Sequence, residues 1–205
     1  LTGLRFLKGQ PVLFGTITLD LAAVLLGGAV ALLPIYARDI LHTGPWGLGL
    51  LRSAPAVGAA CTALYLAWHP PRRAVGQKML LGVACYGAAT IVFGLSSWLP
   101  LSLLALVLLG CADMVSVVIR RTLELTLTPD NMRGRVGATN MIAVGASNEL
   151  GDARAGLMAS LFGAVPAVLV GGVGSILVVG IWTRLFPGLS RVETMDGPGE
   201  SDTAG

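Results

Sequence analysis

Charged residues are scarce in this chain: 12% of its 205 residues are Asp, Glu, Lys or Arg, whereas a soluble domain has about a quarter. Hydrophobic residues make up 54% of the chain, and its mean hydropathy is +0.78. This shortage of charge argues against a soluble domain and favours an integral membrane protein. The net charge of +3 is small, so we expect no binding to nucleic acid.

Residues that usually carry enzyme chemistry are also few. The three cysteines lie singly in apolar segments without a CxxC pair, and the two histidines stand alone near the ends of segments. The sequence has no HExxH, GxSxG or GxxxxGK[ST] motif. We therefore predict that the protein is not an enzyme, needs no cofactor and holds no metal ion.

The apolar residues form six long segments, and a helix needs about 20 such residues to cross a bilayer. The sequence predicts spans at residues 11–36, 48–68, 79–96, 99–119, 136–162 and 165–186. The predicted fold class is an all-α integral membrane protein with one six-helix domain over residues 11–186. Residues 1–10 are interpreted as a cytoplasmic lead-in from a central linker, and residues 187–205 as a disordered cytoplasmic tail.

Basic residues favour one side of the membrane. If both ends lie inside, 11 of the 14 Lys and Arg residues fall in cytoplasmic segments, which are normally the positively charged ones. We therefore expect a multi-pass protein of the cell membrane with both termini in the cytoplasm. Because the chain begins with Leu1 rather than Met, we expect a fragment, a processed chain or a misplaced start codon.

Several polar side chains fall inside the apolar spans, where a charge costs about 2.5–3.5 kcal/mol on insertion scales. Asp20 lies deep in the first span and Asp113 in the inner half of the fourth. In the fifth span Asn148, Glu149 and Asp152 recur at helical spacing and form one polar stripe. We predict that these five residues bind substrate or couple protons, and that Glu149 faces a cavity. The alternative is that Asn148 and Glu149 only tie helices together.

Three further expectations concern local geometry. Arg120 follows Asp113 by seven residues on the same helical face, so we expect it to neutralise Asp113 in part. The pair Gly27-Gly28 favours close packing or a bend. Arg154 lies off the polar stripe and is expected to reach the outer interface or to pair with another span.

Four segments carry a family resemblance, and they occur in this order: TLDLAAVLLGGAVALLPIYARDIL, TPDNMRGRVGATN, GASNELGDARAG and FGAVPAVLVGGVGSILVVGIWTRLFP. Together they resemble the C-terminal six-helix half of a major facilitator superfamily transporter, in the enterobactin-exporter-like branch. The resemblance implies a twelve-helix inner-membrane protein whose two halves rock about a central cavity, driven by an ion gradient. Its partners would be the lipid bilayer, a small-molecule substrate, and an N-terminal six-helix half missing here or a second copy.

The resemblance also implies a cytoplasmic gate. The superfamily's loop signature corresponds to Pro129, Arg133, Gly134 and Arg135, with a weaker counterpart at Arg72 and Arg73 that lacks the acidic residue of the full signature. The predicted function is therefore proton-coupled export of a small molecule such as a siderophore or drug. Two alternatives stay open: a non-transporting membrane scaffold or integral-membrane enzyme, and a half-size transporter that works as a homodimer.

Overall fold

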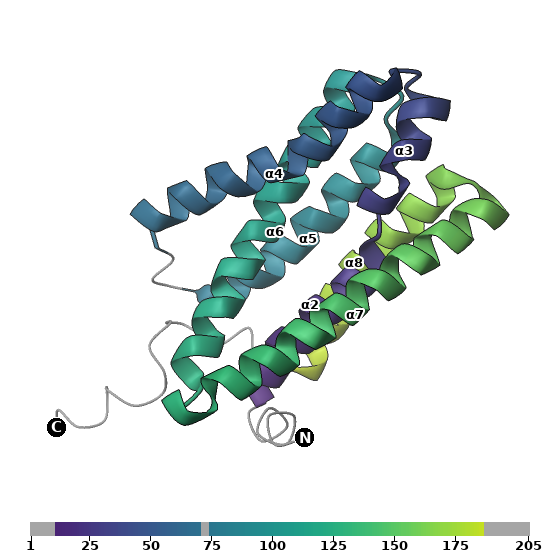
Figure 1. The fold of residues 1–205 in the computed structure, drawn as a ribbon. Helices are drawn as coiled ribbons and strands as arrows, with labels where there is room; N and C mark the ends of the chain where they lie inside the picture. Colours follow the sequence, from purple (N-terminus) through teal and green to yellow (C-terminus); the bar gives the residue numbers. More distant parts are fainter. Residues whose placement is uncertain (1–10, 71–73, 187–205) are drawn as a thin grey trace, which may run out of the picture.

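The computed structural model describes residues 11–70 and 74–186, and within these ranges all regular secondary structure is helical (Figure 1). The elements are α2 (Pro11–Gly27), the 3-10 helix η1 (Val30–Leu32), α3 (Leu33–Ile35), the π-helix η2 (Tyr36–Ile40), α4 (Gly44–Trp68), α5 (Val75–Leu95), α6 (Leu99–Leu127), α7 (Asp130–Phe162) and α8 (Ala164–Leu185). The all-α prediction is confirmed. The predictions for residues 1–10 and 187–205, and for Arg72 and Arg73, lie outside the described residues.

Five stretches are long and apolar enough to cross a membrane: Leu13–Ile40, Gly44–Trp68, Val75–Leu95, Leu99–Leu127 and Ala164–Leu185. They confirm five of the six predicted spans. The exception is α7, whose 33 residues make a helix of about 50 Å at roughly 1.5 Å per residue. This helix is long enough to cross, but its polar residues make it too hydrophilic to count among the apolar spans.

The predicted spans leave residues 120–135 as a loop, and this prediction is wrong because α6 and α7 both extend into that segment. Only Thr128 and Pro129 separate the two helices, and Arg133 and Arg135 lie in the first turns of α7. Proline forces the preceding residue out of the helical region, and Thr128 accordingly has ψ 121°. The chain therefore turns sharply at Pro129 instead of running through a long loop.

The first span is broken in its middle. α2 ends at Gly27, and Gly28 has φ +64°, a conformation that glycine adopts at little cost. A Cβ atom at Gly28 would lie 2.7 Å from the Cβ of Ala155 on α7, so this position also lacks room for a side chain. The bend predicted at Gly27-Gly28 is confirmed, and the span continues beyond it as η1, α3 and η2.

The helices form two groups of three. α4 packs on α6 and α6 on α5, while α8 packs on both α2 and α7, and contacts between α5 and α8 join the groups (Figure 1). A Cβ atom at Gly87 of α5 would lie 2.7 Å from the carbonyl oxygen of Gly172 on α8. Backbone therefore meets backbone at this contact, as small residues allow in membrane helices.

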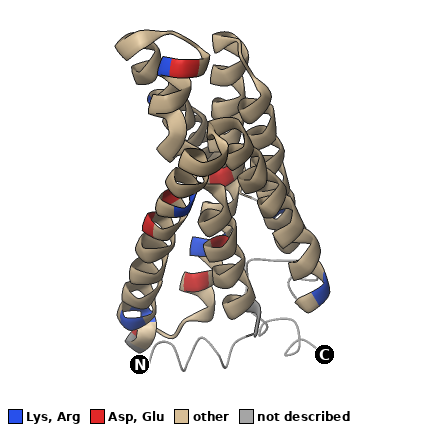
Figure 2. Cartoon of the chain, turned by 90° about the vertical axis from the view of Figure 1, so that its right-hand side faces the viewer, with Lys and Arg blue, Asp and Glu red and all other residues tan. Residues whose placement is uncertain are grey.

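The start of the first described helix, α2, and the end of the last one, α8, lie at the same end of the bundle. The ring centroids of Phe14, near the start of α2, and Phe186, after α8, are 6.5 Å apart. Figure 2 shows basic segments at the lower ends of the helices and one adjacent basic and acidic pair at the upper end. The meeting of the first and last described helices at one end agrees with the even number of crossings that the sequence predicts, and the orientation in the membrane remains a prediction.

Candidate functional site

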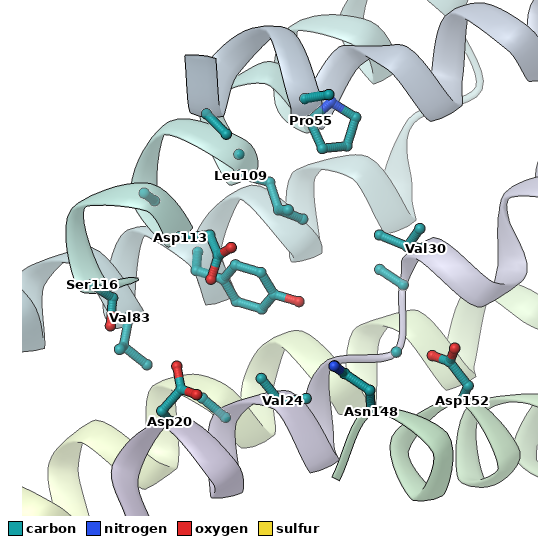
Figure 3. A pocket seen from close by; sticks show the side chains of 18 residues that line it. Asp20, Val24, Val30, Pro55, Val83, Leu109, Asp113, Ser116, Asn148 and Asp152 are labelled. Carbon is teal, nitrogen blue, oxygen red and sulfur yellow. The ribbon is translucent and has the colours of Figure 1, made fainter. Parts of the chain in front are cut away.

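A cavity of about 340 Å³ lies between the two helix groups, beside the break in the first span (Figure 3). Its wall comes from α2, α4, α5, α6 and α7 and from the broken segment Gly28–Val30. Four of the five residues predicted to bind substrate or protons line it: Asp20, Asp113, Asn148 and Asp152. Residues up to 132 positions apart in the sequence thus meet in one polar cavity inside a largely apolar bundle.

Asp20 on α2 forms an ion pair with Arg120 on α6, and both side chains are buried. The expectation that Arg120 neutralises Asp113 is therefore wrong. Seven residues along a helix correspond to a rise of about 10 Å, so Arg120 reaches across to the neighbouring helix rather than back along its own. Breaking a buried pair leaves an uncompensated charge, and this contact therefore holds α2 against α6.

Asp113 and Asp152 have no such partner. Neither carboxylate forms an ion pair or hydrogen bond with another residue in the part of the chain that the structure describes. In Figure 3 Asp113 projects from α6, while Asn148 and Asp152 project from α7 on the other side of the cavity. The cavity thus contains two carboxylates whose charge the described residues do not offset.

The three residues of the polar stripe predicted on α7 do not all point toward the cavity. Asn148 and Asp152 line the cavity, but Glu149 does not, and its side chain is exposed. Successive residues on a helix point about 100° apart, so Glu149 is turned away from the direction that its two neighbours share. The structure does not place Glu149 on the described cavity, and its role in proton coupling stays a prediction.

Arg154 on α7 binds the end of the broken helix. Its Nε atom donates to the carbonyl oxygen of Leu25 at 3.0 Å, and its Nη2 atom donates to the carbonyls of Leu26 and, at 3.4 Å, Gly27. These carbonyls have no helical partners because α2 ends at Gly27, and a membrane offers no water to satisfy them. The expected pairing of Arg154 with another span is confirmed, although its capping of α2 was not predicted.

The predicted gate residues lie at the corner between α6 and α7. Arg133 Nε donates to the carbonyl oxygens of Leu125 and Thr128 at 3.1 and 3.2 Å, and Arg133 forms a 2.5 Å ion pair with Asp130. Pro129 is the N-cap residue of α7. Gly134 and Arg135 are exposed, and among the described residues the Arg135 side chain forms no ion pair.

Glu124 is a buried member of this corner that sequence analysis missed. Its Oε2 atom accepts hydrogen bonds from Asn140 Nδ2 on α7 at 2.8 Å and from Arg121 Nη1 at 3.3 Å. The residue was missed because this part of α6 was interpreted as a loop, where a carboxylate would be exposed. Glu124 and Asn140 add a second polar connection between α6 and α7.

The broken span and the polar cavity between packed membrane helices are features of secondary transporters. In sequence, the chain is similar to the enterobactin exporter EntS of Shigella flexneri, with 31% identity over 153 residues. The match covers 75% of this chain and 35% of that protein, so the chain spans about a third of the relative's length.

No family model matches the chain, and no solved structure matches it. Together with the five apolar spans, the likeness to the exporter supports a multi-pass membrane protein. It is consistent with a protein that is not an enzyme.

Proposed function

We propose that the chain is the C-terminal six-helix half of a proton-coupled secondary exporter, which moves a small molecule such as a siderophore or drug out of the cytoplasm. The observation that carries the proposal is the cavity at the helix break, where Asp113 has no paired cation among the described residues. A carboxylate retained inside a membrane is most often functional. The likeness to an exporter over most of the chain supports the direction of transport.

Asp113 is the proposed proton carrier because of what surrounds it. Asp20 from α2 is already paired with Arg120, Tyr86 contributes a phenol from α5, and Asp152 contributes a second carboxylate from α7. The wall formed by α4 contains only Pro55, Ala56 and Ala59, which do not titrate. Asp113 would take up a proton when the cavity opens to one side and release it when the cavity opens to the other.

The break in α2 is the proposed point of bending during this cycle. Asp20 fixes the helix to α6 before the break, and Arg154 fixes its end to α7. Discontinuous helices beside a central site are a recurring feature of transporters that alternate between two open states. Movement of this six-helix domain against a second one would then open or close the cavity around Asp113.

A second six-helix unit would complete the cavity. Asn148 and Asp152 line it but remain exposed in the described chain, and a polar helix such as α7 is poorly suited to face lipid on all sides. The unit is either an N-terminal half encoded in the same gene or a second copy of this chain. Comparison of the protein mass in detergent with the mass of the denatured chain would separate one chain with two halves from a dimer of half-size chains.

The proposal is tested with the complete gene product in proteoliposomes containing a trapped pH-sensitive dye. Candidate siderophores and drugs are added outside, and a coupled exporter should move protons in the direction opposite to each transported compound. A protonophore should abolish gradient-driven accumulation of the same compounds. Binding of compounds without any proton or substrate flux would contradict the proposal and favour a non-transporting membrane protein.

A further inference from the structure

We infer that the cavity binds an organic cation, such as a protonated amine or a phosphonium, through Asp113 and Asp152. The inference rests on the proposed function, since it names the substrate class of the same cavity. The polar side chains on the wall are the carboxylates of Asp20, Asp113 and Asp152, with Asn148 and two hydroxyl groups. Among the described residues that line the cavity, none is Lys, Arg or His.

The two nearby arginines do not offset these charges. Arg120 is paired with Asp20, which leaves that pair neutral. Arg154 follows Asp152 by two residues, but its guanidinium is bound to the carbonyls at the end of α2. When deprotonated, Asp113 and Asp152 therefore carry two negative charges that neither arginine offsets, so a bound anion would be repelled and a bound cation attracted.

A buried hydroxyl group supplies a second observation. Ser116 lines the cavity with 3% of its surface exposed, and its Oγ atom has no hydrogen-bond partner among the described residues. An unsatisfied buried polar group is unfavourable, so a ligand that forms a hydrogen bond with the Ser116 hydroxyl binds more tightly. Ser116 follows Asp113 by three residues on α6 and shares its helical face. Both side chains can therefore contact one ammonium group.

The rest of the wall sets the shape of the ligand. Val24, Val30, Val83 and Leu109 contribute apolar surface around a volume of about 340 Å³. Apolar walls with a few placed polar groups are typical of small-molecule sites. The cavity therefore suits a compact cation whose charge is surrounded by hydrocarbon, rather than a hydrated metal ion or an acidic compound.

The test compares two ions of the same shape and opposite charge, tetraphenylphosphonium and tetraphenylborate. Equilibrium binding to the purified complete gene product should be saturable for the phosphonium and at least tenfold weaker for the borate. Asp113→Asn should weaken phosphonium binding about tenfold or more, and the exposed Asp152→Asn should weaken it as well. Asp39→Asn is the matched control, because Asp39 is exposed, is paired with Arg38 and does not line the cavity.

Each variant is first checked for a single symmetric peak in gel filtration. Equal binding of both ions, or phosphonium binding that is unchanged in both Asp113→Asn and Asp152→Asn, would overturn the inference. Proton flux driven by a neutral or anionic compound, without phosphonium binding, would overturn the cation inference and leave the proposed function standing. Phosphonium binding without proton flux from any compound would uphold the cation site and contradict the proposed function.

Discussion

The guanidinium of Arg154 on α7 donates a hydrogen bond to the carbonyl oxygen of Leu25 at 3.0 Å, where α2 stops in the middle of the first span. A cation at a helix C-terminus satisfies the free carbonyls and interacts favourably with the helix dipole. The contact joins two segments that are 129 residues apart. It therefore explains how a broken helix is tolerated beside the cavity.

We predict that Arg154→Ala lowers the free energy of unfolding by about 1–3 kcal/mol, because it leaves the carbonyls at the end of α2 without donors inside the membrane. Arg154→Lys should cost less, since it keeps the charge but loses the forked geometry. Thermal unfolding in detergent measures both effects. Arg135→Ala is the control, because Arg135 is exposed and outside any ion pair of the described residues. Equal stability of the two alanine variants would show that the cap has no structural importance.

The buried pair of Asp20 and Arg120 should behave as one unit. We expect Asp20→Asn or Arg120→Gln alone to destabilise the protein by about 3–5 kcal/mol, since each leaves one buried charge uncompensated. The double variant should be more stable than the sum of the two losses predicts. A double-mutant cycle measures this coupling, and additive losses would mean that the two charges do not interact in the membrane.

Topology is tested by cysteine labelling in intact cells, after Cys61, Cys85 and Cys111 are replaced by serine. Ser97 and Thr126 are both exposed and lie at opposite ends of α6. A membrane-impermeant maleimide should label Ser97→Cys from outside and label Thr126→Cys only after the cells are permeabilised. The reason is the concentration of basic residues on the side of Thr126. Labelling of Thr126→Cys in intact cells would reverse the predicted orientation.

The two gate arginines should differ in effect, because only Arg133 binds the end of α6. We expect Arg133→Gln to slow transport severalfold while substrate binding stays nearly unchanged, and Arg135→Gln to have a smaller effect. Transport rate and equilibrium binding are measured on the same preparations. A selective loss of binding affinity in Arg133→Gln would assign this corner to substrate recognition instead of gating.

Local signals in the sequence were sufficient for much of the fold and part of the site. Hydropathy depends on the residues of one segment, so five spans were predicted, four of them with bounds close to those observed. The fourth span was predicted to end at residue 119 but continues to Leu127. A charge inside an apolar segment is also visible locally, and Asp20, Asp113 and Asp152 were found in this way. The double glycine indicated the bend at Gly28 because its conformational freedom is intrinsic to the residue.

The contacts between helices could not be predicted in the same way. Arg120 was assigned to Asp113 by spacing along one helix, whereas its partner Asp20 lies on another helix. Glu124 was missed because the fourth span was predicted to end before it. Its hydrogen bond with Asn140 depends on how α6 and α7 cross. Such pairings are set by tertiary packing, which a single sequence does not reveal.

The most direct test of the central claim compares Asp113→Asn with Glu149→Gln in proteoliposomes of the complete gene product. Both substitutions remove a carboxylate from a predicted span, but only Asp113 lines the described cavity. We predict that Asp113→Asn abolishes transport driven by a proton gradient, while exchange at saturating substrate without a gradient survives. Because Glu149 lies off the cavity wall, we expect Glu149→Gln to stay coupled, contrary to the expectation from the sequence. Normal gradient-driven transport by Asp113→Asn would contradict the account. Loss of coupling in Glu149→Gln alone would instead assign proton coupling to Glu149, on the exposed side of α7 that does not line the cavity.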